Sequence, residues 1–154
     1  SESMPEMTSE ELETALLSEP MYVVETEYVV QDEKYKALYP DMLQAVIKNN
    51  SGIDVKSAIV AFAAWDSHGF PVKIESQYSL GRGSYVVRVN YSDVNMVDGD
   101  TYGHNSGLPL DYESNNISEF KAIVMSYEDF DGNIWNNPYY DTWIGMYENK
   151  KLVQ

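Results

Sequence analysis

The feature that most constrains the fold is an apolar run, Val55–Trp65, that lies between two turn-forming stretches. Asn49–Gly52 precedes the run and Asp66–Gly69 follows it, and Asn, Asp, Ser and Gly all favour chain reversal. The run is rich in β-branched and aromatic residues, and although propensity alone also allows a short helix, the flanking turns restrict it to strand length. An extended chain then has two apolar faces: Ala58, Val60, Phe62 and Ala64 on one, and Ile59, Ala61, Ala63 and Trp65 on the other.

Two apolar faces predict that this segment is the central strand of a two-layer sandwich and excludes water on both sides. Asp131 and Gly132 form a strong hairpin signal, with a return strand that begins at Asn133. About seven strands separated by regular turns indicate an all-β antiparallel sandwich. The other expected strands are Met21–Gln31, Leu43–Lys48, Val72–Ile74, Tyr85–Tyr91 and Glu119–Tyr127.

The N-terminal end carries a helix signal. Thr8 and Glu11 have the spacing of a capping box, which predicts a short amphipathic helix over Ser9–Ser18. We expect residues 1–20 to form a linker and this helix at the domain edge, and residues 21–154 to form the sandwich domain.

Several other segments leave alternatives open. Tyr35–Pro40 and Tyr139–Tyr147 are ambiguous between helix and strand. Ser92–Glu113 is too long for an ordinary connection, so it is either functional or contains a short strand. The polar tail Glu148–Gln154 is expected to be frayed.

The charge balance excludes one class of partner. The chain has 25 acidic and 10 basic residues and a formal net charge of −15. Nucleic acid is excluded because its phosphates require a basic surface, and docking on an anionic membrane is disfavoured for the same reason. The simplest role of such acidity is solubility.

The chain has no cysteine, which excludes disulfides, thiolate nucleophiles and zinc ribbons. No apolar run approaches the ~20 residues of a membrane span, so we expect no membrane insertion by this fragment. Because the chain begins with Ser1, we expect a processed product from which any signal peptide or anchor has been removed.

Two segments carry a resemblance to known domains: KNNSGIDVKSAIVAFAAWDSHGFPVKI and, later, FKAIVMSYEDFDGNIWNNPYYDTW. Together they resemble immunoglobulin-like domains of uncharacterised Gram-positive bacterial lipoproteins and membrane-anchored proteins, over about Met21–Lys151. The resemblance implies an immunoglobulin-like, extracytoplasmic sandwich module and supplies no functional residues. Unlike antibody domains, the chain has no cystine beside Trp65, so core packing has to replace that bond.

One loop gathers candidate metal ligands. Asp93, Asp98, Asp100 and His104 bring three carboxylates and an imidazole into one segment. Calcium prefers oxygen ligands of this kind, and a transition metal would use the imidazole. The spacing matches no standard metal loop, and Asp and Gly are also ordinary turn residues.

Catalytic signals are weak. The two histidines, His68 and His104, both lie in turn-like segments, and no Ser–His–Asp arrangement is indicated. Paired carboxylates for glycoside cleavage are conceivable among so many acids, but nothing places two across a cleft. We therefore expect a non-enzymatic protein without a cofactor, calcium being the one candidate.

Aromatic residues are abundant, with 13 Tyr and 3 Trp, and several gather near the C-terminus. Tyr and Trp are enriched at interfaces, so Trp135, Tyr139, Tyr140 and Trp143 form a candidate binding surface. The alternative is that alternate members fill the core and the others cover its edges.

The sequence therefore predicts a binding or structural module of a bacterial cell-envelope protein, anchored to the membrane in its precursor. Its partner is an unidentified protein or envelope component. The alternative is a module that binds calcium or carbohydrate through the Asp93–His104 loop or the C-terminal aromatic cluster.

Overall fold

The computed structural model describes residues 7–30, 34, 41–75, 83–110 and 116–152. The ambiguous segment 35–40 therefore lies outside the described residues. The elements in chain order are α1 (Ser9–Leu16), β1 (Met21–Val29), β2 (Met42–Asn49), β3 (Val55–Trp65), β4 (Pro71–Val72), β5 (Val86–Tyr91), β6 (Thr101–Tyr102), β7 (Gly107–Pro109), β8 (Glu119–Asp129), β9 (Ile134–Asn136) and α2 (Tyr140–Tyr147).

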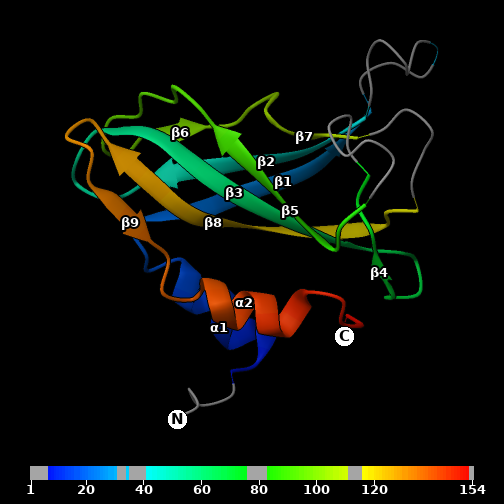
Figure 1. The fold of residues 1–154 in the computed structure, drawn as a ribbon. Helices are drawn as coiled ribbons and strands as arrows, with labels where there is room; N and C mark the ends of the chain where they lie inside the picture. The colour runs from blue at the N-terminus through cyan, green and yellow to red at the C-terminus, as the bar shows by residue number, and fades with distance from the viewer. Residues whose placement is uncertain (1–6, 31–33, 35–40, 76–82, 111–115, 153–154) are drawn as a thin grey trace.

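The strands form two antiparallel sheets that stack as a sandwich, as the sequence predicted (Figure 1). The four-stranded sheet has the order β1-β2-β6, and β7 also pairs with β2. The five-stranded sheet has the order β4-β3-β8-β9, and β5 also pairs with β3. The two helices lie together below the five-stranded sheet in Figure 1.

Strand β3 confirms the prediction for the central segment. Phe62 and Trp65 are both 0 % exposed, although they point to opposite faces. The face with Phe62 packs against the four-stranded sheet, together with Ala58, Val60 and Ala64. The face with Trp65, Ala61 and Ala63 packs against the helices instead.

Both faces of β3 are therefore buried as predicted, but the second sheet covers only one of them. A strand in a two-layer sandwich turns one face to the other sheet and the second to the outside. Here α1 and α2 cover that second face with Leu12, Leu16, Trp143 and Tyr147.

Helix α1 begins as its sequence predicts. The Thr8 hydroxyl accepts a hydrogen bond from the Glu11 N–H, and the Glu11 carboxylate accepts one from the Thr8 N–H. Hydrogen bonding from the Thr8 backbone, and then from its side chain, lowers the pKa of the Glu11 carboxyl. Leu12 is fully buried, so the helix packs on a sheet face rather than at the domain edge.

The long segment after β5 contains short strands, which was one of the two alternatives. β6 and β7 both pair with β2, through Ile47 opposite Tyr102 and Leu43 opposite Leu108. Gly103, with a φ of +128°, lies so close to β2 that a Cβ atom there would meet the Ala45 carbonyl oxygen. Only glycine permits this approach.

The hairpin predicted at Asp131 and Gly132 joins β8 to β9, and Gly132 has a φ of +85°. The Asp129 carboxylate accepts hydrogen bonds from the backbone N–H groups of Asp131 and Asn133 and from the Asn133 side chain. Burial favours the neutral acid, but these hydrogen bonds outweigh it and lower the pKa of Asp129.

The C-terminal segment after α2 is anchored rather than frayed, at least as far as Leu152. The Leu152 N–H donates to the Gly69 carbonyl (2.8 Å), and the Trp65 indole N–H donates to the Lys150 carbonyl (2.8 Å). The tail therefore completes the hydrogen bonding of a core tryptophan.

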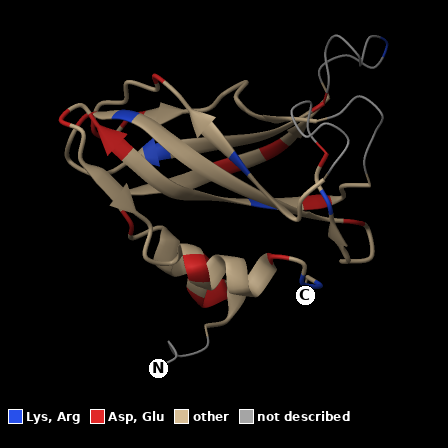
Figure 2. Ribbon diagram, in the orientation of Figure 1, with Lys and Arg blue, Asp and Glu red and all other residues tan. Residues whose placement is uncertain are grey.

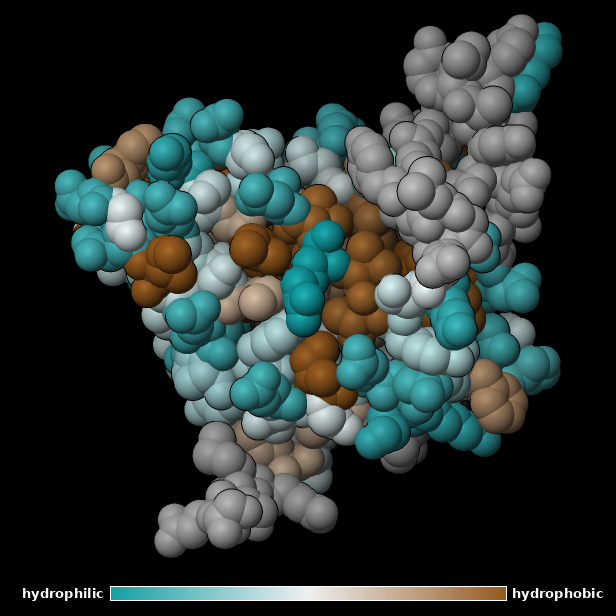
Figure 3. All heavy atoms as spheres, viewed as in Figure 1, coloured by the Kyte–Doolittle hydropathy of each residue, from teal (hydrophilic) through white to brown (hydrophobic). Residues whose placement is uncertain are grey.

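Acidic residues are spread over the strands, the helices and the turns, with few basic residues between them (Figure 2). In the view of Figure 3, apolar surface gathers over the middle of the molecule and hydrophilic residues surround it. None of the helices in the described ranges has the length and hydrophobicity needed to cross a bilayer.

Candidate binding groove

The four predicted metal ligands do not come together. Among the residues described, no three side chains of His, Cys, Asp or Glu lie close enough to hold a metal ion. Asp98 instead accepts a hydrogen bond from the Gly52 N–H (2.9 Å), and the Asp100 backbone carbonyl accepts one from the Asn49 N–H. Asp93 has a positive φ and lies in the turn after β5, and His104 lies between β6 and β7. The described residues of this loop therefore do not form the ligand cluster that the sequence predicted.

The four predicted aromatic binding residues belong to two different clusters. Trp135 packs against the core between the sheets and stacks on Tyr127, with ring centroids 5.2 Å apart. Trp143 is 1 % exposed and lies among the residues between the helices and the sheet, so its ring is not available at the surface.

Tyr139 and Tyr140 are half-buried at the start of α2. The Tyr140 hydroxyl accepts a hydrogen bond from the Arg88 side chain (2.9 Å), and the Arg88 guanidinium also lies over the Tyr140 ring. The aromatic residues therefore mainly pack the helices onto the sheet. A role in binding stays a prediction for the two tyrosines and Trp135.

A groove instead follows from the unequal lengths of two neighbouring strands. β8 has 11 residues and β9 has 3. β9 pairs only with Ser126–Glu128, after which the chain turns away into α2. In the described part of the chain, no strand continues the pairing along the first half of β8 on the edge away from β3.

Asn137 closes the paired part of this edge. Its backbone N–H donates to the Met125 carbonyl (2.8 Å), and its side-chain amide donates to the Val124 carbonyl (2.9 Å). The Asn137 side chain in turn accepts from the Tyr139 N–H, at the start of α2. One buried asparagine therefore ends β9, holds the edge of β8 and redirects the chain.

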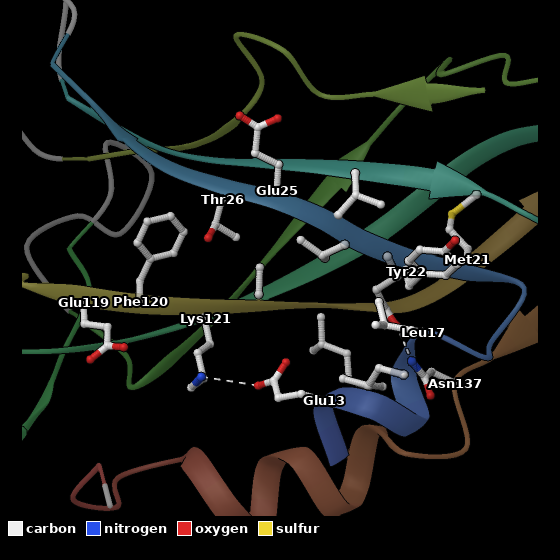
Figure 4. A pocket seen from close by; sticks show the side chains of 16 residues that line it. Glu13, Leu17, Met21, Tyr22, Glu25, Thr26, Glu119, Phe120, Lys121 and Asn137 are labelled. Carbon is white, nitrogen blue, oxygen red and sulfur yellow. Dashed lines mark hydrogen bonds and ion pairs between the residues drawn. The ribbon is translucent and has the colours of Figure 1, made fainter. Parts of the chain in front are cut away.

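The unpaired half of β8 borders a groove of about 310 Å³ (Figure 4). Residues 119–124 of β8 form one bank, and residues 21–26 of β1 form the other. The C-terminal half of α1 lies along the β8 side in Figure 4, where Lys121 and Glu13 form an ion pair at 3.3 Å. Asn137 lies at one end and Phe120 near the other.

The rim of the groove exposes apolar side chains beside acidic ones. Leu17 is 56 % exposed and Val24 is 45 % exposed, and both line the groove. Among the charged lining residues, Glu13, Glu25 and Glu119 stand against Lys121. The groove is thus a partly apolar channel whose lining carries three carboxylates and one ammonium group.

A second exposed apolar area lies at one end of the sandwich, where three turns meet. Val55, the first residue of β3, pairs with both Met96 and Asp129, so the segments around these residues are neighbours. The large apolar side chains exposed there are Ile53, Val97, Phe130 and Ile134.

Sequence reasoning did not find the groove, although one signal for it was present. The hairpin at Asp131 is followed by Asn136, Asn137 and Pro138, which stop the return strand early. A long strand with a short returning partner leaves part of its edge unpaired. That β1 and α1 border this same edge depends on the tertiary fold and has no local signal.

Comparisons with known proteins place the chain in a family but do not assign an activity. The model of a family described as "Family of unknown function (DUF5780)" matches residues 42–150. A hypothetical protein from Peptoclostridium difficile 630, solved by X-ray crystallography, is similar with a TM-score of 0.67. That similarity has 11% sequence identity and covers 88% of this chain and 94% of that chain, so it concerns the fold alone. No curated protein matches the sequence.

Proposed function

The chain belongs to the DUF5780 family, whose function is unknown, and we propose that it is a non-enzymatic binding module of a bacterial cell-envelope protein. The groove between β1 and β8 is its binding site, and the partner is a protein or another envelope component. The observation that carries this proposal is an unpaired strand edge beside exposed Leu17 and Val24. Exposed apolar side chains next to open backbone groups are characteristic of interaction sites.

The proposal includes an immunoglobulin-like topology. The pairing of β1, β2 and β6 in one sheet and of β5, β3, β8 and β9 in the other supports this part of the proposal, in which β8 and β9 take the places of the last two strands. The resemblance found in the sequence supports the same reading. In this topology, the groove occupies the place of the missing length of the final strand.

The proposal also includes a location outside the cytoplasmic membrane, with an anchor in the precursor. It is supported by the sequence resemblance to anchored Gram-positive proteins. Protease treatment of intact bacteria that produce the full-length protein tests this part. Degradation is expected while a cytoplasmic marker survives, and protection of the protein until the cells are lysed would contradict it.

A titration of the isotope-labelled protein with a panel of probes tests the binding function. The panel contains a peptide mixture, envelope oligosaccharides and calcium chloride, followed by amide chemical shifts. We expect at least one organic probe to shift the amides of Ala122, Val124 and Val24 and to raise the melting temperature, because it binds only the folded state.

Two variants with matched exposure provide the control. Leu17→Arg changes the groove rim, and Val97→Arg makes the same change at a residue that is 55 % exposed at the loop end. Leu17→Arg should weaken binding at least tenfold, and Val97→Arg should leave it within twofold. If no probe shifts the groove amides, or if both variants bind equally, the groove is not the binding site.

A further inference from the structure

Resting on the proposed function, we propose that the groove binds an extended peptide that adds a strand to the open edge of β8. The peptide runs antiparallel to β8, in the place that a longer β9 would occupy. It alternates apolar residues with lysine or arginine.

The direction of the backbone groups of β8 supports this binding mode. In an antiparallel ladder, alternate residues direct their N–H and C=O groups to opposite edges. The Val124 carbonyl points away from β3, because it accepts its hydrogen bond from the Asn137 side chain. Two and four residues earlier, Ala122 and Phe120 present their backbone groups to the same edge, along the groove.

The paired segment that this edge can offer is short but sufficient for recognition. Phe120 to Val124 spans about 13 Å at ~3.3 Å per residue. Strand addition gains affinity from main-chain hydrogen bonds and specificity from the pockets that receive alternate side chains. The groove of about 310 Å³ beside this edge provides the space for those alternate side chains.

The opposite bank is less suited to pairing. β1 has a register shift between Val23 and Glu25 where it pairs with β2, so the strand is irregular in the middle of the groove. Bulges of this kind disturb a regular edge. We therefore assign the hydrogen bonds of the peptide to β8 and the side-chain contacts to β1 and α1.

The composition of the peptide follows from the lining. Leu17 and Val24 offer exposed apolar contacts, and Glu25 and Glu119 offer carboxylates on opposite banks. Apolar side chains at every second position of the peptide contact Leu17 and Val24. Lys or Arg side chains at the intervening positions pair with Glu25 and Glu119. A second copy of this chain is a poor occupant, because each copy carries a net charge of −15.

The test uses a synthetic nine-residue peptide of alternating Lys and Val with blocked ends, and a scrambled peptide of the same composition. Hydrogen exchange of the protein amides is the main measurement. The amides of Phe120 and Ala122 should exchange at least tenfold more slowly with the alternating peptide. The amide of Lys121, which faces β3, provides the internal control and should change little.

Two N-methylated versions of the peptide identify the pairing edge. Methyl groups on the amides of every valine block one edge of the extended peptide, and methyl groups on those of every lysine block the other. One version should bind like the parent and the other should bind at least tenfold more weakly. Equal binding of the two versions would overturn strand addition and leave groove binding standing.

Charge variants on one strand test the basic character of the peptide. Glu25→Lys changes a residue that lines the groove, and Glu27→Lys makes the same change two residues along β1, outside the lining. Glu25→Lys should weaken binding at least threefold at low salt, and Glu27→Lys should have less than half that effect. Equal effects would overturn the charge assignment.

The outcomes separate this inference from the proposed function. If an oligosaccharide or another peptide shifts the groove amides and the Lys/Val peptide does not, the inference fails and the binding function stands. If no probe shifts those amides, both fail.

Discussion

The face of the five-stranded sheet that meets the other sheet and the face that meets the helices bury different kinds of side chain. Between the sheets the buried core is largely aliphatic and includes Phe62. Under the helices, the Tyr147 ring packs edge to face against two tryptophans. Its ring centroid lies 5.6 Å from that of Trp65 and 5.4 Å from that of Trp143.

The aromatic face also depends on polar contacts made by the tips of its rings. The Trp65 indole donates to the Lys150 carbonyl, and the Tyr147 hydroxyl donates to Glu13 (3.4 Å). These partners lie far away in the sequence, in the tail and in α1. The difference teaches that the core between the sheets is held by the strand ladders, whereas the helix layer depends on contacts between the chain ends.

The largest effect is expected from Phe62→Ala. Its side chain is fully buried between the sheets, and such truncations cost about 3–5 kcal/mol of the free energy of unfolding. Urea denaturation measures the loss. Val97→Ala, at an exposed position, should change stability by less than about 0.5 kcal/mol. Similar losses of stability for the two variants would contradict the burial of Phe62 in the core.

Trp143→Ala is expected to have the next largest effect. The cost of a buried tryptophan, about 3–5 kcal/mol, is here an upper limit, because the helices can separate while the sheets stay paired. Hydrogen exchange should accelerate most in α1 and α2 and least in the ladder between β2 and β1. Uniform acceleration would show that the two faces unfold as one unit.

Each face buries a tyrosine whose ionisation makes stability depend on pH in alkaline solution. Burial raises the pKa of Tyr91 between the sheets, and burial and the Glu13 carboxylate raise the pKa of Tyr147 under the helices. The unfolded chain releases these protons near the ordinary tyrosine pKa of 10.0 and the folded chain does not. The contribution of these two tyrosines to the free energy of unfolding is therefore fully present below about pH 10 and falls as the pH rises above it.

Phenylalanine variants separate the two contributions. Tyr91→Phe should cost about 1–3 kcal/mol near neutral pH, because the Ala45 carbonyl loses its donor, and should flatten the fall above pH 10. Tyr147→Phe should flatten it as well, at a smaller cost near neutral pH, because its hydroxyl bond is longer. Urea midpoints at pH 9 and pH 11 test both variants. If the midpoint falls between these two pH values as much as in the parent, the tyrosine does not cause the loss of stability.

The smallest effect is expected from Thr8→Ala. Loss of the capping box costs about 1 kcal/mol and acts on α1 alone. Hydrogen exchange should accelerate in the first turn of α1 and leave the sheets unchanged. A loss as large as that of Trp143→Ala would show that the start of α1 supports the whole helix layer.

Local signals predicted the elements well. The apolar run Val55–Trp65 with its flanking turns, the capping box at Thr8 and the hairpin at Asp131 act within a few residues, and each is found where the sequence placed it. Tyr139–Tyr147 stayed ambiguous because aromatic residues suit a strand as well as a buried helix. Its helical form, α2, follows the break at Asn137 and Pro138.

The candidate site was predicted less well, for a physical reason. The Asp93–His104 loop has the composition of a metal site, but its side chains and backbone are used in turns and pairing to neighbouring segments. Trp143 has the composition of an interface residue and is buried by α1 and β3. Residue type indicates what a side chain can do, and only its neighbours decide what it does.

By itself, the sequence determined that β3 is extended and apolar on both faces, because turn residues and strand propensity act locally. Only the tertiary structure decided what covers the second face and which strand edge stays open. Trp65 and Lys150 meet across 85 positions of the chain, and the groove joins residues 21–26 to residues 119–124. Such contacts depend on how the whole chain closes, and no short pattern encodes them.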